Sequence, residues 1–225
     1  MQDRIEHTTL AEKAYAQLRS GLISTQFRPG EILKIRSLAD QYGISATPVR
    51  EALQRLVVEN ALEMQPNKSF RVPVLTVARF NEIRRIRCAL EPIASKLAFQ
   101  NLGENDVRQL ENLVEEMQEA VATRNIADYM SGNERFHFGI YERSEAPLLV
   151  GMIRDLWMLA APYFALLFEG SNYPVNSNDW HKQALMAIRQ KNADGFGNAI
   201  YEDINLAAED LVPKLQGTFL PRQSY

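Results

Sequence analysis

Cysteine is nearly absent from this chain of 225 residues, in which Cys88 is the only one. A single cysteine excludes an internal disulfide and zinc modules built on several cysteines, and it is typical of a protein kept in a reducing cytoplasm. The opening residues MQDRIEHTTL lack the basic start and apolar run of a signal peptide, so no export is expected. The most apolar stretch, residues 156–168, is too short to span a bilayer and contains Pro162, so we expect no membrane partner.

A strong positive charge, which would by itself indicate a nucleic-acid partner, is also lacking, because the formal net charge is -3. Residues 1–75 carry 10 Lys/Arg and 8 Asp/Glu, whereas the rest of the chain carries 15 and 20. This asymmetry agrees with a DNA-binding N-terminal part but does not identify one. With 46% hydrophobic residues the chain can bury two cores, and we place the two domains at residues 1–75 and 76–225.

Residues 31–64 have the make-up of two helices joined by a tight turn. The apolar residues of the first helix are Leu33, Ile35, Leu38, Ala39 and Tyr42. They follow helical spacing up to Gly43, which can take the positive φ that ends a helix. A second helix is expected to begin near Thr47, because Ser45 and Thr47 offer capping hydroxyls and Pro48 suits a first helical turn.

The second helix has one side that packs and another that can reach DNA. Val49, Leu53 and Leu56 recur at three- and four-residue spacing, whereas Thr47 and Arg50 point elsewhere. This layout is typical of a helix-turn-helix, in which hydroxyls and amides at the start of the second helix hold phosphates and an arginine can contact guanine in the major groove. The alternative is an ordinary αα-hairpin with solvated arginines.

Two short alternating runs follow this helix pair. Residues 61–64 and 70–74 flank the polar segment 65–69, which predicts a two-stranded hairpin with a polar tip. Such a hairpin would form a wing beside the helix pair, with Lys68 placed to contact a DNA phosphate.

Residues 10–74 resemble the winged-helix domain of the GntR family of bacterial transcriptional regulators. The segments that carry the resemblance are RPGE at 28–31, LADQYGIS at 38–45 and TPVREAL at 47–53. The resemblance implies operator contacts at the start of the second helix, although Ala46 stands where many members have Arg and the wing tip lacks the usual glycines. With the wing lysine added, the predicted DNA-binding residues are Arg36, Ser45, Ala46, Thr47, Arg50 and Lys68.

The second part of the chain is predicted to be helical almost throughout, because apolar residues recur at helical spacing and strand signals are few. The predicted helices are 77–101, 104–124, 126–144, 146–169, 178–191 and 195–215, with residues 170–178 as a loop. Their short connections favour an antiparallel bundle. The sequence therefore predicts a mainly α protein, with an N-terminal winged helix-turn-helix that has a small β wing and a C-terminal all-helical bundle of about six helices.

Four polar residues of this bundle can converge. Asn133 and His137 are four residues apart and therefore share a helix face. His181 and Asp203 lie equally far on either side of Asn192, so an antiparallel hairpin turning there would set them level. An amide oxygen, two imidazoles and a carboxylate inside a bundle suit a divalent metal such as zinc, nickel or manganese. The alternative is a set of buried polar residues satisfied by their own hydrogen bonds.

Residues 80–212 resemble the FCD domain, the all-helical effector-sensing domain of the FadR branch of the GntR family, in the segments RCALEPIASKLA at 87–98 and NERFHFGIY at 133–141. Many members of that branch bind a metal through an Asp and a His four apart and two later His residues. His137 and His181 match two of these positions, whereas Asn133 replaces the Asp and Asp203 replaces the last His. The predicted metal ligands are Asn133, His137, His181 and Asp203.

The same resemblance places Arg87 near the effector pocket. Its guanidinium could clamp a ligand carboxylate, and the alternative is a structural salt bridge to Glu91. The predicted effector-binding residues are Arg87, Asn133, His137, His181 and Asp203.

Together these features predict a ligand-responsive, DNA-binding transcriptional repressor rather than an enzyme. It would bind a palindromic double-stranded DNA operator as a cytoplasmic homodimer and sense a small organic acid, with or without a divalent metal. A metal-dependent hydrolase or lyase that uses the Asn/His/His/Asp residues is the alternative, although no motif such as HExxH supplies a general base. An architectural DNA-binding protein without a ligand is a third possibility.

Overall fold

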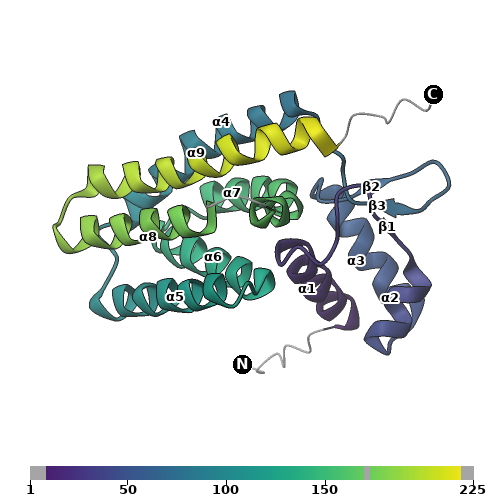
Figure 1. Ribbon diagram of the computed structural model, residues 1–225. Helices are drawn as coiled ribbons and strands as arrows, with labels where there is room; N and C mark the ends of the chain where they lie inside the picture. The colour runs from purple at the N-terminus through teal and green to yellow at the C-terminus, as the bar shows by residue number, and fades with distance from the viewer. Residues whose placement is uncertain (1–8, 170–172, 219–225) are drawn as a thin grey trace, which may run out of the picture.

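The computed structural model describes residues 9–169 and 173–218, with the side chains of residues 9–169 and 177–215. It places a small N-terminal winged-helix domain beside a longer helical bundle (Figure 1). The chain passes from one to the other at the residues that precede helix α4.

From residue 9 onward, where the structure describes it, the N-terminal domain contains three helices and a small sheet. The helices are α1 (Leu10–Ile23), α2 (Ile35–Tyr42) and α3 (Ala46–Val58). The strands β1 (Ile32–Leu33), β2 (Glu63–Met64) and β3 (Phe70–Arg71) form an antiparallel sheet in the order β1-β3-β2. The predicted wing is thus confirmed, but the prediction missed β1. The prediction assigned Leu33 to the first helix of the pair, which was wrong. Leu33 instead lies in β1, where it pairs with Phe70, and its side chain is buried.

Local capping residues explain where these helices begin and end. Thr9 accepts a hydrogen bond from the Glu12 amide at 3.1 Å while the Glu12 carboxylate accepts from the Thr9 amide, which forms a capping box at α1. Gly43 ends α2 with φ 66°, as its lack of a side chain permits. The α2–α3 turn therefore forms where the sequence predicts it.

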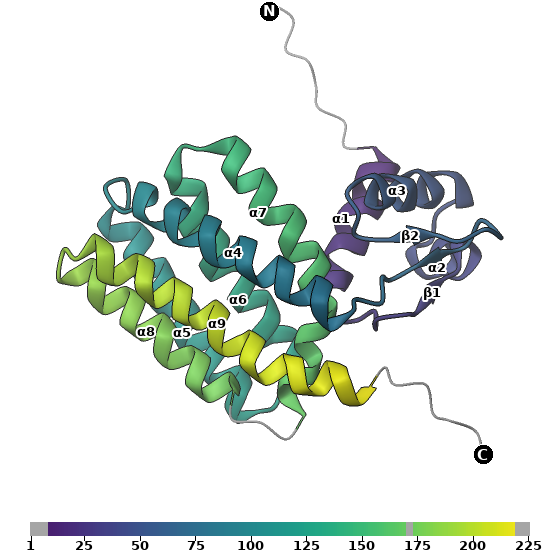
Figure 2. The same ribbon diagram turned by 90° about the horizontal axis from the view of Figure 1, so that it is seen from above.

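The second domain contains six helices among its described residues, in agreement with the prediction. They are α4 (Val77–Ala98), α5 (Glu104–Ala122), α6 (Ile126–Tyr141), α7 (Pro147–Ala160), α8 (Tyr173–Arg189) and α9 (Ala193–Thr218). Short 3-10 segments, η1 (Glu142–Ser144) and η2 (Ala161–Phe168), extend α6 and α7. Helix α4 packs against α7 and α9, and α5 packs against α6 and α8, so the three helices α7, α4 and α9 lie side by side (Figure 2).

Two boundaries of the bundle differ from the prediction. Residues 173–177, predicted as loop, are helical, because α8 begins at Tyr173, whereas residues 170–172 lie outside the described part. The predicted single helix 146–169 narrows to a 3-10 segment after Ala160, because Pro162 cannot donate to a regular helical hydrogen bond.

The stretch Pro147–Phe168 is long and apolar enough to cross a membrane by length and composition, with a mean hydropathy of 1.3. Half of its most apolar window is buried inside the protein. In this fold the stretch forms α7 and η2, where Trp157 and Tyr163 are fully buried in the core. Apolar side chains of this stretch thus contribute to the core of the bundle.

Polar contacts join the domains in the described part of the chain. The hydroxyl of Tyr163 accepts a hydrogen bond from the Leu75 amide at 2.5 Å and donates to the Pro73 carbonyl at 2.9 Å. Arg19 of α1 forms an ion pair with Glu134 of α6 at 2.7 Å. The Arg19–Glu134 ion pair reaches the helix that also carries Asn133 and His137.

Candidate functional site

The predicted DNA-binding residues all lie on the surface. Exposed side chains occur at every predicted position, namely Arg36, Ser45, Ala46, Thr47, Arg50 and Lys68. Within the described part of the chain, no ion pair or hydrogen bond engages the guanidinium groups of Arg36 and Arg50. These cations are therefore available to a nucleic-acid partner.

The start of α3 is an exposed helix terminus with free donors. Ser45 is its N-cap residue but its side chain makes no capping hydrogen bond in this structure. The amides of Ala46 and Thr47 fall in the first turn, where no intrahelical carbonyl lies within reach, whereas Pro48 has no amide hydrogen. Since the first turn of α3 contains no acidic residue, its partial positive charge is not cancelled.

The wing tip is held by local hydrogen bonds. The Asn67 Oδ1 accepts from the Ser69 amide at 3.1 Å and from the Ser69 hydroxyl at 2.7 Å. Lys68 has φ 62°, so it adopts the left-handed conformation that glycine would occupy most easily. The tip therefore turns without glycine and leaves the ammonium group of Lys68 exposed.

The predicted cluster in the bundle is brought together by three helices. His137 of α6, His181 of α8 and Asp203 of α9 are buried, and their ligand atoms all lie within 4.8 Å of one another. Asp203 Oδ2 is 3.2 Å from His137 Nε2 and 3.7 Å from His181 Nε2. The predicted pairing of His181 with Asp203 across an antiparallel hairpin is thus realised, with the turn near Asn192.

Some buried polar atoms of this region have no hydrogen-bond partner among the described residues, and two of them belong to the predicted metal ligands. They are Asn133 Oδ1 and His181 Nε2. Asn133 lies one helical turn before His137 on α6, and both side chains are buried. Because a buried acceptor without a donor is unfavourable, these atoms indicate that a cation or a donor belongs near them.

Burial and charge set the protonation states of the cluster. Burial lowers the pKa of His181, an effect that the carboxylate of Asp203 only partly offsets. Burial by itself would raise the pKa of Asp203, but the two neighbouring imidazoles, His181 before His137, outweigh it and hold that pKa well below its usual range. A neutral imidazole beside an ionised carboxylate is the combination that metal binding requires.

Several residues around the cluster were not predicted from the sequence. Ser177 donates a hydrogen bond to Asp203 Oδ1, and Asn178 Oδ1 lies 3.2 Å from His181 Nδ1. Tyr141 contacts His137 Nδ1 at 2.9 Å. These partners come from other turns or other helices, and polar or aromatic residues at such positions give no distinctive signal in a sequence.

Arg87 forms the salt bridge that the sequence left open as an alternative. Its Nε donates to Glu91 Oε1 at 2.6 Å, and its guanidinium carbon lies 4.8 Å from the ring centre of Trp157. Burial would lower the pKa of Arg87, but the neighbouring carboxylate of Glu91 outweighs this effect and raises it. A contact between Arg87 and an effector stays a prediction.

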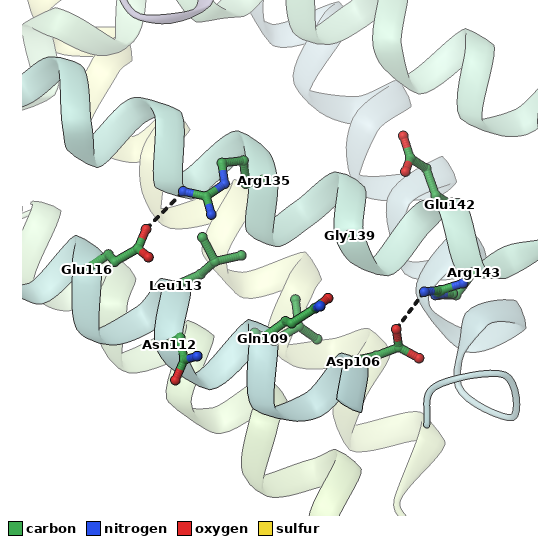
Figure 3. A pocket seen from close by; sticks show the side chains of 10 residues that line it. Asp106, Gln109, Asn112, Leu113, Glu116, Arg135, Gly139, Glu142 and Arg143 are labelled. Carbon is green, nitrogen blue, oxygen red and sulfur yellow. Dashed lines mark hydrogen bonds and ion pairs between the residues drawn. The ribbon is translucent and has the colours of Figure 1, made fainter. Parts of the chain in front are cut away.

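A surface hollow of about 520 Å³ lies elsewhere, between α5 and α6 (Figure 3). At its two ends lie the ion pairs Arg135–Glu116 and Arg143–Asp106, with Gly139 between them (Figure 3). These charges are already neutralised within the protein. The hollow therefore lacks the unpaired buried acceptors that distinguish the cluster.

Family comparisons cover both domains. Residues 10–72 match the model described as bacterial regulatory proteins, gntR family, and residues 82–206 match the FCD domain. The regulator McbR of Escherichia coli K12 is 34% identical over 202 residues, which cover 88% of this chain and 91% of McbR. The transcriptional repressor RspR of the same strain is 20% identical over 200 residues, covering 89% of this chain and 88% of RspR.

Solved structures show the same architecture. The structure of E. coli McbR/YncC aligns with a TM-score of 0.84 and 32% identity, covering 95% of this chain and all of the other. A putative GntR regulator from Rhodococcus sp. RHA1 aligns with a TM-score of 0.72 over 93% of this chain and 99% of the other, and at 18% identity it shows the fold alone. The relatives are named as regulators, so the hydrolase or lyase alternative is not supported.

Proposed function

Because this chain belongs to the gntR family of bacterial regulatory proteins and carries an FCD domain, we propose that it is a cytoplasmic, homodimeric repressor whose helical bundle senses a small metabolite through a divalent metal. That it is a DNA-binding transcriptional regulator follows from the family. Repression is supported by the name of RspR, a repressor. Its placement in the FadR branch stays a prediction.

The DNA contact is proposed to be made by the start of α3 and by the wing. Ser45 and Thr47 would hold a phosphate with their hydroxyls and amides, while Arg50 would reach a base edge in the major groove. Lys68 at the wing tip would contact a neighbouring phosphate. Ala46 adds no charge, so base preference at that position would differ from relatives that have Arg there.

The sensing part of the proposal is carried by one observation, the buried convergence of His137, His181 and Asp203 beside the unpartnered Asn133 Oδ1. These four residues fit a divalent metal, since imidazole nitrogens and carboxyl or amide oxygens suit zinc, nickel or manganese. A bound metal would act as a Lewis acid that accepts further oxygen ligands. His137 and Asn133 would hold it from α6, and the other two ligands from α8 and α9.

The effector is proposed to be a small organic acid. Four protein donors leave coordination positions open on an octahedral metal, which a ligand carboxylate could fill. Its remaining groups would lie against the buried aromatic residues of the bundle, including Phe136 and Trp157. The buried side chain of Arg87 is proposed to line this effector site.

The homodimer is proposed to form through the outer face of α4. Ile86, Ile93 and Leu97 form an exposed apolar stripe on this helix, and Ile93 and Leu97 are 50% and 49% exposed. Met152 of α7 and Tyr201 of α9 are also exposed, and these helices flank α4 (Figure 2). A second copy covering this face would bury the stripe and present two reading helices to successive major grooves.

Operator binding and ligand binding test the two halves of the proposal separately. A duplex selected by the protein from a random-sequence library is titrated by fluorescence anisotropy. Arg50→Ala should weaken binding by about 1–3 kcal/mol, as expected for a lost base or phosphate contact. Arg135→Ala, which removes an equal charge from an exposed part of the bundle, is the matched control and should bind normally. Equal binding by the Arg50 variant would contradict the role of α3.

The sensing half is tested with zinc. His137→Ala should lose zinc binding and any zinc or organic-acid response, while its metal-free form should bind the duplex nearly as well as wild type. The reason is that His137 is buried inside the bundle, whereas α3 belongs to the winged-helix domain. If the variant kept the full zinc or organic-acid response, the sensing site would have to lie elsewhere in the protein.

A further inference from the structure

Glu91 lies at the centre of a buried hydrogen-bond network that ends on His137. Its side chain is 0% exposed, and Oε1 accepts a hydrogen bond from Arg87 Nε at 2.6 Å. The other oxygen, Oε2, accepts from the Tyr141 hydroxyl at 2.5 Å and from Trp157 Nε1 at 3.2 Å. Since the N–H groups of arginine and tryptophan can only donate, Glu91 is the acceptor in these bonds.

These hydrogen bonds of Glu91 determine which group donates in the contact between Tyr141 and His137. Tyr141 has a single hydroxyl hydrogen, and its short contact with Glu91 uses that hydrogen. The Tyr141 oxygen is therefore left to accept from His137 Nδ1, which lies 2.9 Å away. A neutral imidazole has one N–H, so a hydrogen on Nδ1 leaves the lone pair on Nε2.

That lone pair points into the cluster. His137 Nε2 lies 3.2 Å from Asp203 Oδ2. The second imidazole is oriented by a separate route, because Asn178 donates its amide hydrogen to the Val114 carbonyl and leaves its Oδ1 to accept from His181 Nδ1. Both rings thus present an Nε2 lone pair toward the same carboxylate.

We propose that Glu91 and Tyr141 are positioning residues that hold His137 in the Nδ1–H tautomer and so prepare Nε2 to bind a divalent metal. This inference rests on the proposed metal site. Hydrogen bonds to the outer nitrogen of a ligating histidine typically change metal affinity by about 10–100-fold. Arg87 contributes indirectly to this positioning, because its guanidinium forms an ion pair with the Glu91 carboxylate.

The first test reads the tautomer directly in full-length, metal-free protein. The chain has only three histidines, so long-range ¹H–¹⁵N spectra of the rings are simple to assign with a His137→Gln variant. In spectra recorded at mildly alkaline pH, wild type should show a protonated Nδ1 and a bare Nε2 at His137. Glu91→Gln should reverse this pattern, because the new amide can donate to Tyr141 and make its hydroxyl donate to His137.

The second test measures zinc affinity by competition with a chromophoric chelator. Tyr141→Phe should bind zinc about 10–100-fold more weakly than wild type, because Nδ1 loses its acceptor. Ser95→Ala is the matched control, since it removes another buried hydroxyl beside Glu91 that donates to the backbone carbonyl and not to the carboxylate, and it should leave zinc affinity and tautomer unchanged. Thermal melts of each metal-free variant verify that it is folded.

We call the hydrogen bonds from Glu91 through Tyr141 to His137 the relay. A hydrogen on Nε2 of His137 in metal-free wild type would overturn this relay, as would full zinc affinity in a folded Tyr141→Phe variant. If wild type bound no zinc but showed the Nδ1–H tautomer and its reversal in Glu91→Gln, the proposed metal site would fail while the relay stood. If zinc bound tightly but the tautomer were the opposite one, only the relay would fail.

Discussion

Replacing Glu91 by leucine should destabilise the bundle far more than any exposed carboxylate does. Glu91 is completely buried, and it is the hydrogen-bonded partner of the buried Arg87. Leucine has a similar volume, so packing would change little. The substitution would leave a guanidinium without its counter-charge inside the protein.

The magnitude follows from the groups that lose a partner. Removing one member of a buried ion pair costs about 3–5 kcal/mol, because the other charge remains desolvated. The indole N–H of Trp157 would also lose its acceptor, at a cost of about 1–3 kcal/mol, whereas the Tyr141 hydroxyl could donate to His137 Nδ1 instead. Since domains are stable by only about 5–15 kcal/mol, the Glu91→Leu bundle should be close to unfolding.

The double variant Arg87→Met with Glu91→Leu separates the two contributions. It removes both charges, so the cost of the unpaired guanidinium disappears and most of the lost stability should return. The cost at Trp157 should remain. Glu116→Leu is the matched control, because Glu116 pairs with Arg135 where both side chains are more than half exposed, and it should cost less than about 1 kcal/mol.

Urea unfolding followed by tryptophan fluorescence measures these differences. Both tryptophans of the chain, at positions 157 and 180, lie in the bundle, so the signal reports on that domain alone. A loss below about 1 kcal/mol in Glu91→Leu would refute the reasoning, since it would equal the effect of a surface pair. A double variant no more stable than the single one would refute the role assigned to the buried charge.

Three further changes test other parts of the structure. Leu97→Lys should give a monomer in sedimentation-velocity runs, because it places a charge in the apolar stripe of α4, whereas Met186→Lys on exposed α8 should leave the oligomeric state unchanged. Gly43→Ala should lower the stability of the N-terminal domain by about 1–2 kcal/mol, read by amide exchange in α2 and α3, because φ is 66° and no other atom crowds the site. Asn133→Asp should raise zinc affinity but lower the melting temperature of metal-free protein, because it adds a second buried carboxylate beside Asp203; a higher metal-free melting temperature would contradict this.

The N-terminal domain was largely predictable because its signals are local. Gly43, Ser45 and Pro48 mark the helix-turn-helix within a few residues of the observed ends. The error at Leu33 has a physical cause, since a single apolar residue at helical spacing fits a two-residue strand equally well. Only pairing with β3, almost forty residues later, decides between the two.

The bundle was predictable where helical spacing or hairpin symmetry relates two residues. Asn133 and His137 share a face because they are four residues apart, and His181 meets Asp203 because α8 and α9 are antiparallel. The start of α8 was not predictable, because its first turn contains Tyr173 and Pro174, which read as a loop. Pro174 lies in the first turn, where its missing amide hydrogen costs nothing.

The sequence by itself determined the winged-helix and bundle architecture, the α2–α3 helix pair and the residue types of the cluster, because helical period, capping residues and turn residues act over a few neighbours. The tertiary structure alone decided that Glu91 faces Tyr141 and Trp157, which lie 50 and 66 residues away. It also decided which ring nitrogen of His137 faces Asp203. Such directions depend on how three helices pack together, and a hydrogen bond acquires a donor and an acceptor only when both side chains are buried in place.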